Sequence, residues 1–445
     1  MRFLYSLFLF CISLTFGFSQ SGFQLPKNQK KAVIPFQMIN NLIFIPIQVN
    51  GETLTFLLDT GVEETVLFSL DDKEEVSLHQ LEKIKLRGLG TNEAVEAFKS
   101  SANKLETAGF ADENHEMYLI LDQEFNFSSQ VGIPVNGIIG YHFFKDHLVE
   151  IDYDRKKVIV YADNYTKIRK RIRKTYAQET ISLENNKPYY VSTINTTIHK
   201  RTSKLLIDTG NSDAIWLFLS EAEDISLPSK NIQCYLGRGF SGNVYGHRAR
   251  IASFSFGSQT FSQPIGTFPD STSIRSVNFV ANRVGSIGGE VLSRFSVFFD
   301  YPNSSLFTKP GAKLKAPFNF NMSGLEIQHD GLEWVTQTYQ DRSGNGSVIK
   351  TTQDNNFGHV QDNLKIKFEL KPVFRIFNVR EGSPAQAAGL QKDDRIISLN
   401  GKNAHYLTIE KINELLKSED GRTIVITVER KGVQLTYKFQ LKSIL

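Results

Sequence analysis

The sequence predicts a mostly β protein in which two similar lobes are followed by a separate α+β module. Three observations support this fold class. The tripeptide Asp-Thr-Gly occurs twice, 149 residues apart, a glycine-bearing hairpin pattern follows each copy, and the last third of the chain has a different composition. Pro and Gly divide short apolar runs throughout, and long helical periodicity is scarce, as expected for β-rich domains. With 445 residues, the chain has room for two or three domains.

An internal repeat organises about the first three hundred residues. Each Asp-Thr-Gly follows three apolar residues, and the segment 136–161 parallels the segment 284–309 at an offset of 148 residues. We therefore expect two homologous lobes, at 30–163 and 178–310. The basic stretch at 164–177 is interpreted as a solvated interlobe linker, and a patch for anionic surfaces or a processing site is the alternative.

The duplication also indicates what the two repeated acids do. Pseudo-two-fold symmetry brings equivalent residues together at its axis, so Asp59 and Asp208 should face each other. Two carboxylates about 3 Å apart cannot both ionise comfortably, so the pair holds one proton. Such a pair can take a proton from water while giving one to a peptide carbonyl. The neighbours that would support it, by close backbone approach and by hydrogen bonds across the lobes, are Thr60, Gly61, Thr209 and Gly210.

These residues resemble the aspartic proteases, in the single-chain, two-lobed form related to retropepsins and pepsins. "DTGVEETVL" is close to the retroviral form of the motif, and "NGIIGYHFF" resembles the apolar-apolar-Gly segment that supports the acid loop. The resemblance implies a bilobal acid-protease β-barrel fold, with Asp59 and Asp208 as the catalytic dyad for peptide hydrolysis at acid pH. It also implies two hairpin flaps over the substrate, with candidate residues Gly88, Leu89, Gly90, Gly239, Phe240, Gly242 and Tyr245.

The end of the chain, residues 315–445, resembles a PDZ domain. "GSPAQAAGL" and "KDDRIISLNGK" carry the likeness. PDZ domains bind extended peptides between a strand and a helix, and N–H groups of a loop receive the peptide carboxylate. The resemblance implies that a helix near 408–416 forms one wall of the groove, and that an inserted hairpin or loop occupies about 331–361. The residues implied for peptide binding are Ser323, Gly324, Leu325 and Ile327.

The first twenty residues have the layout of a secretory signal peptide. An early Arg precedes an apolar run and then small polar residues, and the run is short for an uncleaved membrane anchor. We expect a periplasmic or secreted protein with no stable membrane span after cleavage. Cys234 would then be the only cysteine, which excludes an internal disulfide and a cysteine-rich zinc site.

Charge and histidine placement narrow the classes of partner. A formal net charge of +4 gives no reason to invoke nucleic acid, and the histidines show no metal-ligand spacing, so no metal or cofactor is expected. Two functions stay open. One is an exported aspartic endopeptidase that acts on proteins or peptides, with a PDZ domain that binds extended segments or protein C-termini. The other is a non-catalytic, peptide-binding scaffold that retains the protease fold.

Overall fold

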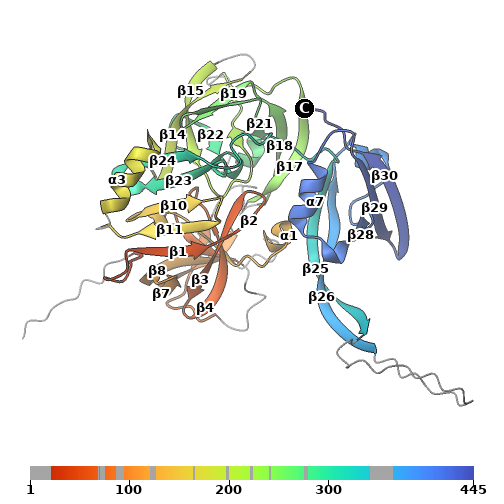
Figure 1. Ribbon diagram of the computed structural model, residues 1–445, viewed down its shortest axis with the longest axis horizontal. Coiled ribbons are helices and arrows are strands. Elements are labelled where there is room, and N and C mark those ends of the chain that lie inside the picture. The colour runs from red at the N-terminus through yellow and green to blue at the C-terminus, as the bar shows by residue number, and fades with distance from the viewer. Residues whose placement is uncertain are drawn as a thin grey trace, which may run out of the picture.

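The computed structural model describes residues 22–68, 70, 76–86, 95–120, 127–163, 166–196, 200–220, 224–239, 242–274, 279–340 and 364–445. The expected signal peptide and the flap candidates Gly88, Leu89, Gly90 and Phe240 lie outside these ranges. Figure 1 shows a two-lobed, strand-rich body with a smaller C-terminal module beside it. The predicted fold class, mostly β with a C-terminal α+β module, is confirmed.

The N-terminal lobe is built on an eight-stranded sheet that partly closes on itself, because β3 also pairs with β7. Its strands, in spatial order, are β2 (Gln37–Ile39), β3 (Leu42–Val49), β4 (Glu52–Leu58), β9 (Gly137–Ile139), β5 (Thr65–Leu67), β8 (Phe110–Ile120), β7 (Val95–Thr107) and β6 (Glu82–Leu86). The short helices are α1 (Phe127–Val131) and α2 (Tyr141–Phe144).

The C-terminal lobe repeats this plan in a larger sheet. Its strands, in spatial order, are β17 (Asn231–Gly239), β18 (Gly242–Arg250), β21 (Ile265–Pro269), β16 (Ile215–Leu217), β22 (Arg283–Ile287), β15 (Lys200–Ile207), β14 (Lys187–Asn195), β19 (Ser253–Phe256) and β20 (Gln259–Ser262), with β13 (Ser182–Glu184) on β14. The short helices are α4 (Ser271–Ile274) and α5 (Gly289–Leu292). In both lobes the acid-bearing strand runs parallel to a partner, β4 to β9 and β15 to β22.

A third sheet joins the two lobes. Its strands, in spatial order, are β1 (Lys31–Pro35), β11 (Lys157–Tyr161), β10 (Leu148–Asp152), β23 (Phe295–Asp300), β24 (Ser305–Pro310) and β12 (Ala177–Thr180), and the 3₁₀ turn η1 (Tyr301–Asn303) links β23 to β24. In the central pair, Leu148 lies opposite Asp300 and Asp152 lies opposite Ser296. Since equivalent residues of the repeat are 148 positions apart, this register is the one that a two-fold axis through the β10–β23 pair requires.

The basic interlobe segment is more ordered than a solvated connector. Residues Thr166–Thr175 form helix α3. Ile168 and Ile172, four residues apart, are buried on one face against Phe298, and Arg169 pairs with the buried Asp300. The other basic side chains of the helix are exposed. An apolar i, i+4 pair inside a basic run is the signal for this amphipathic helix.

The N-terminal lobe begins before the predicted boundary at residue 30. Phe23 is buried, and its ring stacks on Phe110 at a centroid distance of 4.9 Å. Gln24 and Ala111 form a β-bridge. This early segment therefore contributes to the core of the lobe.

The C-terminal module is a six-stranded sheet with two α-helices and one short 3₁₀ helix. Its strands are β25 (Leu325–Gln340), β26 (Leu364–Val379), β27 (Arg395–Leu399), β29 (Thr423–Arg430) and β30 (Val433–Gln440), with β28 (Lys402–Asn403) on β27. The helices are α6 (Pro384–Ala387), η2 (Ala404–Tyr406) and α7 (Ile409–Leu416). Of the segment expected as an insertion, 331–340 continues β25 as a hairpin with β26, and 341–361 lies outside the described residues.

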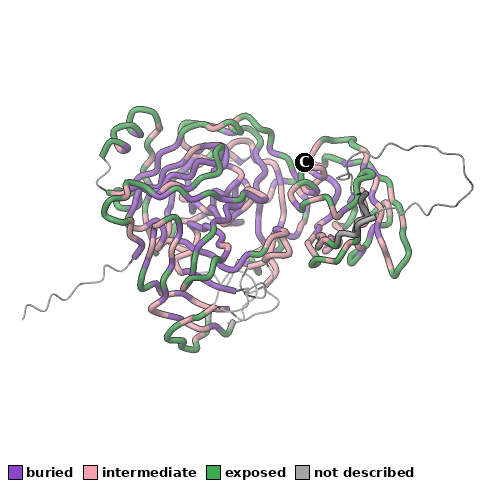
Figure 2. The backbone as a smooth tube through the Cα atoms, turned by 60° about the horizontal axis from the view of Figure 1, so that its bottom comes forward, coloured by how far each residue is buried: buried purple, intermediate pink, exposed green. Residues whose placement is uncertain are grey.

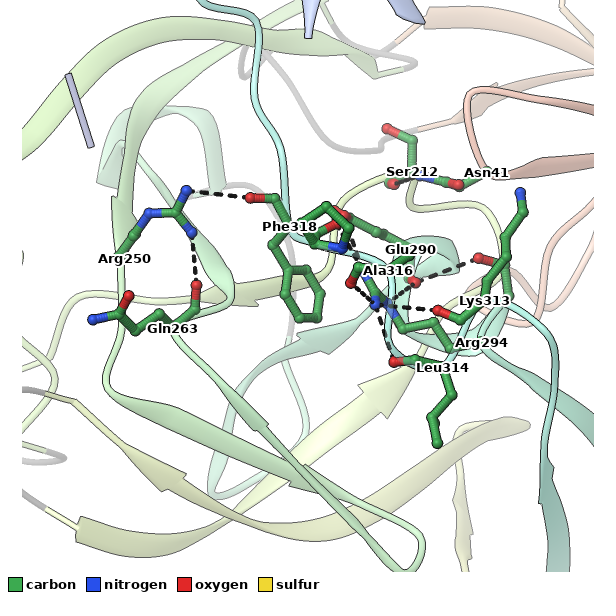
Figure 3. Close-up of polar contacts among 12 residues, drawn as sticks. Asn41, Ser212, Arg250, Gln263, Glu290, Arg294, Lys313, Leu314, Ala316 and Phe318 are labelled. Carbon is green, nitrogen blue, oxygen red and sulfur yellow. Dashed lines mark hydrogen bonds and ion pairs between the residues drawn. The ribbon is translucent and has the colours of Figure 1, made fainter. Parts of the chain in front are cut away.

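One continuous cluster of buried apolar side chains extends from both lobes into the module. Figure 2 shows buried backbone running through the body and exposed residues at its edges. The connecting segment 311–318 is clamped by Arg294, which is only 3% exposed and donates hydrogen bonds to the carbonyls of Lys313 and Leu314 (Figure 3). Its guanidinium carbon lies 3.8 Å from the ring centroid of Phe318. The joint between body and module is therefore packed.

Candidate active site

The two repeated acids end equivalent strands. Asp59 follows β4, and its N–H donates to the carbonyl of Ile139 on β9, with an N···O distance of 2.9 Å. Asp208 follows β15, and its N–H donates to Ile287 on β22, also at 2.9 Å. Each acid is thus held at the end of a parallel strand pair of its own lobe, which restricts its movement.

The structure brings the two carboxyl groups close enough to act directly on each other. The N–H of Gly61 donates to Asp59 Oδ1 at 2.7 Å, and the N–H of Gly210 donates to Asp208 Oδ1 at 3.2 Å. A Cβ added to Gly210 would lie 2.1 Å from Asp59 Oδ2, and one added to Gly61 would lie 2.8 Å from Asp208 Oδ1. Each glycine thus lies against the acid of the opposite lobe, where a side chain would separate the pair.

Two buried threonines connect the acid loops across the lobe interface. The N–H of Thr60 donates to Thr209 Oγ1 at 3.0 Å, and the N–H of Thr209 donates to Thr60 Oγ1 at 3.1 Å. Each hydroxyl then donates to a carbonyl of the opposite lobe, Thr60 to Ile207 and Thr209 to Leu58, both at 2.7 Å. These four hydrogen bonds set the spacing of the loops that carry the acids.

Burial and mutual repulsion favour one shared proton. Burial raises the pKa of Asp59 above its ordinary value, and the charge of Asp208 raises it further. Burial also raises the pKa of Asp208, but the positive charge of Arg283 and the hydrogen bond from Asp59 oppose that rise. The two carboxyl groups therefore favour holding one proton between them, with the larger rise in pKa at Asp59.

Two cations near the dyad were not found from the sequence. The charges of Lys187, on β14, and Arg283, on β22, both stabilise ionised Asp208, and Lys187 also acts on Asp59. Arg283 Nε donates to the carbonyl of Gly285 at 3.1 Å, and its guanidinium carbon lies 4.8 Å from the ring centroid of Phe279. Lys and Arg are common at strand ends, so only the folded chain distinguishes these two.

The described flap candidates lie on the β17–β18 hairpin. Gly239 pairs with Gly242 at its end, and the side chain of Tyr245 is 44% exposed, with its ring 5.6 Å from that of Tyr235. In the N-terminal lobe, β6 and β7 form the corresponding hairpin, whose tip is outside the described residues. The role of both hairpins as flaps stays a prediction.

The four residues implied for peptide binding in the C-terminal module are buried where β25 begins: Ser323, Gly324, Leu325 and Ile327. Helix α7 lies beside this segment, and the N–H of Met322 donates to the carbonyl of Leu416 at 3.0 Å. The strand and the helix expected as the walls of a groove are therefore neighbours.

Comparison with known proteins supports both resemblances. Residues 45–143 match the aspartyl protease family model, and residues 375–430 match that of the PDZ domain. The chain thus carries an aspartyl protease domain and, after it, a PDZ domain. The structure is also similar to the crystal structure of the aspartic proteinase from Irpex lacteus, with 13% sequence identity and a TM-score of 0.41. That match covers 65% of this chain and 100% of the other.

Within the described ranges, no helix combines the length and apolar character that crossing a membrane requires. The same residues include no group of three or more His, Cys, Asp or Glu side chains arranged to hold a metal ion.

Proposed function

We propose that this protein is an exported aspartic endopeptidase in which Asp59 and Asp208 share one proton and activate water. The observation that supports this best is the close approach of two carboxyl groups, buried Asp59 and half-buried Asp208, that end equivalent strands of the two lobes. Two repelling carboxyl groups at a largely buried lobe interface cost folding free energy, and a non-catalytic scaffold would gain nothing from them.

The unequal surroundings of the two acids suggest their roles. Ionised Asp208 accepts a proton from a bound water, whose oxygen attacks the carbonyl carbon of the substrate. Asp59 gives its proton to the carbonyl oxygen, and a tetrahedral diol forms. Asp208 then returns its proton to the leaving nitrogen while a diol hydroxyl reprotonates Asp59, so the pair regains its starting state.

The PDZ domain is proposed to bind peptide segments, and the protein is proposed to act in the periplasm or outside the cell. The N-terminal sequence pattern is the support for export. An edge strand beside a helix is the arrangement that accepts an added peptide strand, and β25 with α7 is that arrangement here.

The test is proteolysis of a denatured protein mixture by the purified mature chain between pH 3 and pH 8, with new termini identified by mass spectrometry. Asp59→Asn and Asp208→Asn should each lower turnover by about 10³-fold, since each removes one member of the proton-transfer pair. A statine-type transition-state mimic should block the wild-type protein. Asp163→Asn, at an acid whose side chain is 69% exposed, is the matched control. Unchanged cleavage by both dyad variants would contradict the endopeptidase and leave the scaffold function.

A further inference from the structure

The groove of the PDZ domain is covered by a part of the N-terminal protease lobe. Helix α1, Phe127–Val131, packs against both β25 and α7 (Figure 1). Gly132 follows directly, and a Cβ added to it would lie 3.2 Å from Ile409 Cγ2 on α7. Within the described residues, β25 pairs only with β26, so its other edge faces this segment.

Two cavities, one on either side of the segment 130–133, indicate how much of the groove this segment fills. One cavity, of about 460 Å³, is bordered by Gln130, Glu326 and Lys417, and also by Arg294 and Glu290 of the C-terminal lobe. The other, of about 450 Å³, is bordered by residues 131–133, by His329 of β25 and by Ile409 of α7. The segment 130–133 therefore occupies the middle of the groove, and open space remains at both ends.

The loop that would receive a peptide carboxylate has its N–H groups occupied by its own chain. Asn321 Oδ1 accepts hydrogen bonds from the N–H groups of Ser323, at 3.0 Å, and Gly324, at 3.3 Å. The N–H of Leu325 donates to Ser323 Oγ at 3.0 Å, and that hydroxyl donates to Asn321 Oδ1 at 2.7 Å. The amide oxygen of Asn321 thus lies where a carboxylate oxygen would bind.

This loop has little freedom to open. Asn321 Nδ2 donates to the carbonyl of Leu325 at 2.6 Å, which holds the amide in place. Gly324 has a φ of +83°, and a Cβ on it would lie 2.2 Å from Ser383 Cβ, so the loop lies directly against α6. The N–H of Arg380 donates to the carbonyl of Gly324 at 2.8 Å. A terminal carboxylate would have to displace Asn321 from a packed loop.

We propose that the PDZ groove is a docking site for the chain's own segment 127–133, and that the partner able to replace it is an extended internal peptide segment. The proposal rests on the peptide-binding role proposed above for the PDZ domain. A protein C-terminus is disfavoured because the three loop N–H groups that would bind its carboxylate already donate to Asn321 Oδ1 and Ser323 Oγ.

The segment 127–133 also contacts the C-terminal lobe, so its release from the groove would change contacts within the two lobes. Gln130 Nε2 donates to the hydroxyl of Tyr235 on β17 at 3.2 Å, and the Tyr235 ring lies 5.2 Å from Phe377 of the PDZ domain. Downstream, Asn136 Oδ1 accepts the N–H of Thr55 on β4 at 2.9 Å, in the strand that ends at the N-lobe acid. A peptide that displaces α1 therefore changes contacts at the hairpin of one lobe and beside the acid-bearing strand of the other.

The first experiment measures hydrogen exchange in the full chain carrying Gly132→Gln. The new side chain must strain a backbone with φ of +75° and push against Ile409, so exchange in 325–330 and 409–416 should become at least tenfold faster. Gly51→Gln is the matched control, because Gly51 also has a positive φ, +101°, but its Cβ would have no neighbour within 4 Å. Equal exchange in both variants and the wild-type protein would overturn the docking site.

A second substitution tests the interface from the PDZ side. Asn413 Nδ2 donates to Asn40 Oδ1 at 3.2 Å, from α7 to the N-terminal lobe, and Asn413 is half-buried. Asn413→Lys removes this hydrogen bond without touching the PDZ core, so it should also speed exchange in 325–330, by about threefold. An unchanged rate in Asn413→Lys, combined with a Gly132→Gln effect that extends into the N-lobe strands, would show local unfolding and refute the proposal.

The third experiment separates internal segments from C-termini. The probe is a fluorescent peptide with the sequence of residues 125–135, made once with a free terminal carboxylate and once with a terminal amide. The Gly132→Gln protein should bind both forms within a factor of two, and adding Asn321→Ala should create at least a tenfold preference for the free acid. A preference for the free acid in Gly132→Gln alone, or no binding of either form, would overturn the proposal. Proteolytic activity is not used in any of these readouts, so a failed endopeptidase assay leaves them intact.

Discussion

Asp59 and Asp208 are equivalent in the repeat and identical in chemistry, yet their surroundings differ. The positive charge of Arg283 acts on Asp208 alone, whereas Asp59 bears the larger rise in pKa from burial and repulsion. We infer that this difference assigns the proton to one acid before any substrate binds.

The proton on Asp59 should appear in the pH dependence of stability. Because folding raises its pKa from 3.8 to about 8, the folded state keeps, between those pH values, a proton that the unfolded chain has lost, so the stability linked to this group is lost as pH rises through that range. Asp59→Asn should therefore increase the free energy of unfolding at pH 7, by on the order of 1–3 kcal/mol, and change it little at pH 3. Urea unfolding at both pH values measures this, and an equal effect at the two would contradict the assignment.

Replacing Thr209 is expected to lower the free energy of unfolding more than the small size of its side chain would suggest. Thr209→Val keeps the shape but leaves the N–H of Thr60 and the carbonyl of Leu58 without partners in a buried interface. The expected loss is about 2–4 kcal/mol in the free energy of unfolding, with a fall in activity as the acid loops lose their spacing. Thr202→Val, at an exposed position of β15, is the control and should stay within about 0.5 kcal/mol of the wild-type protein.

Among the elements, α3 is a short helix whose basic charge favours a different prediction, that of a solvated linker. Six basic residues within 166–174 predict a solvated linker, but two isoleucines one turn apart are sufficient to anchor the helix. The helix packs on the interlobe sheet, beside β10 and β23, where the two-fold axis passes. We expect it to stabilise the contact between the lobes.

Ile172→Ala tests that role. The side chain is 1% exposed, so its truncation should leave a cavity and lower the free energy of unfolding by about 2–4 kcal/mol. Lys170→Ala, on the exposed face of the same helix, should change stability by less than about 0.5 kcal/mol. Thermal unfolding of both variants is the measurement. Equal losses would mean that charge rather than packing holds the helix.

At the scale of the whole molecule, charged side chains lie at the contact between the two-lobed body and the PDZ domain. Glu290 of the C-terminal lobe lies 3.5 Å from Arg294, and the charge of Lys417, at the end of α7, also acts on it. Burial nevertheless raises the pKa of Glu290 to about 7, which means that the neighbouring cations do not offset the loss of water. The interface therefore favours the protonated acid.

Glu290→Gln should stabilise this interface at high pH only. The folded pKa exceeds the unfolded value of about 4.5, so the stability linked to Glu290 is present at low pH and is lost as pH rises toward 7. At pH 8 the variant should gain roughly 3 kcal/mol in the free energy of unfolding over the wild-type protein, and at pH 4 almost nothing. Denaturant titrations at the two pH values check this, with Glu414→Gln, an exposed acid on α7, as the control. A gain of the same size at pH 4 would exclude titration as the cause.

The sequence by itself determined the duplication, the repeated acids with their Thr-Gly neighbours, and the two kinds of domain. These follow from local patterns, because apolar periodicity, turn residues and repeat spacing are properties of neighbouring positions. The offset of 148 residues even anticipates the register of β10 against β23. The expectation that the acids meet came from symmetry, which a repeat implies without coordinates.

Only the tertiary structure decided which distant residues surround those features. Lys187 and Arg283 reach the dyad, α1 lies over the PDZ groove, and Asn321 occupies the N–H groups of its loop, and no local pattern indicated any of these. The physical reason is that each depends on long-range packing. The effect of a charge, a helix or an amide is set by its neighbours in space, and these come from distant parts of the chain.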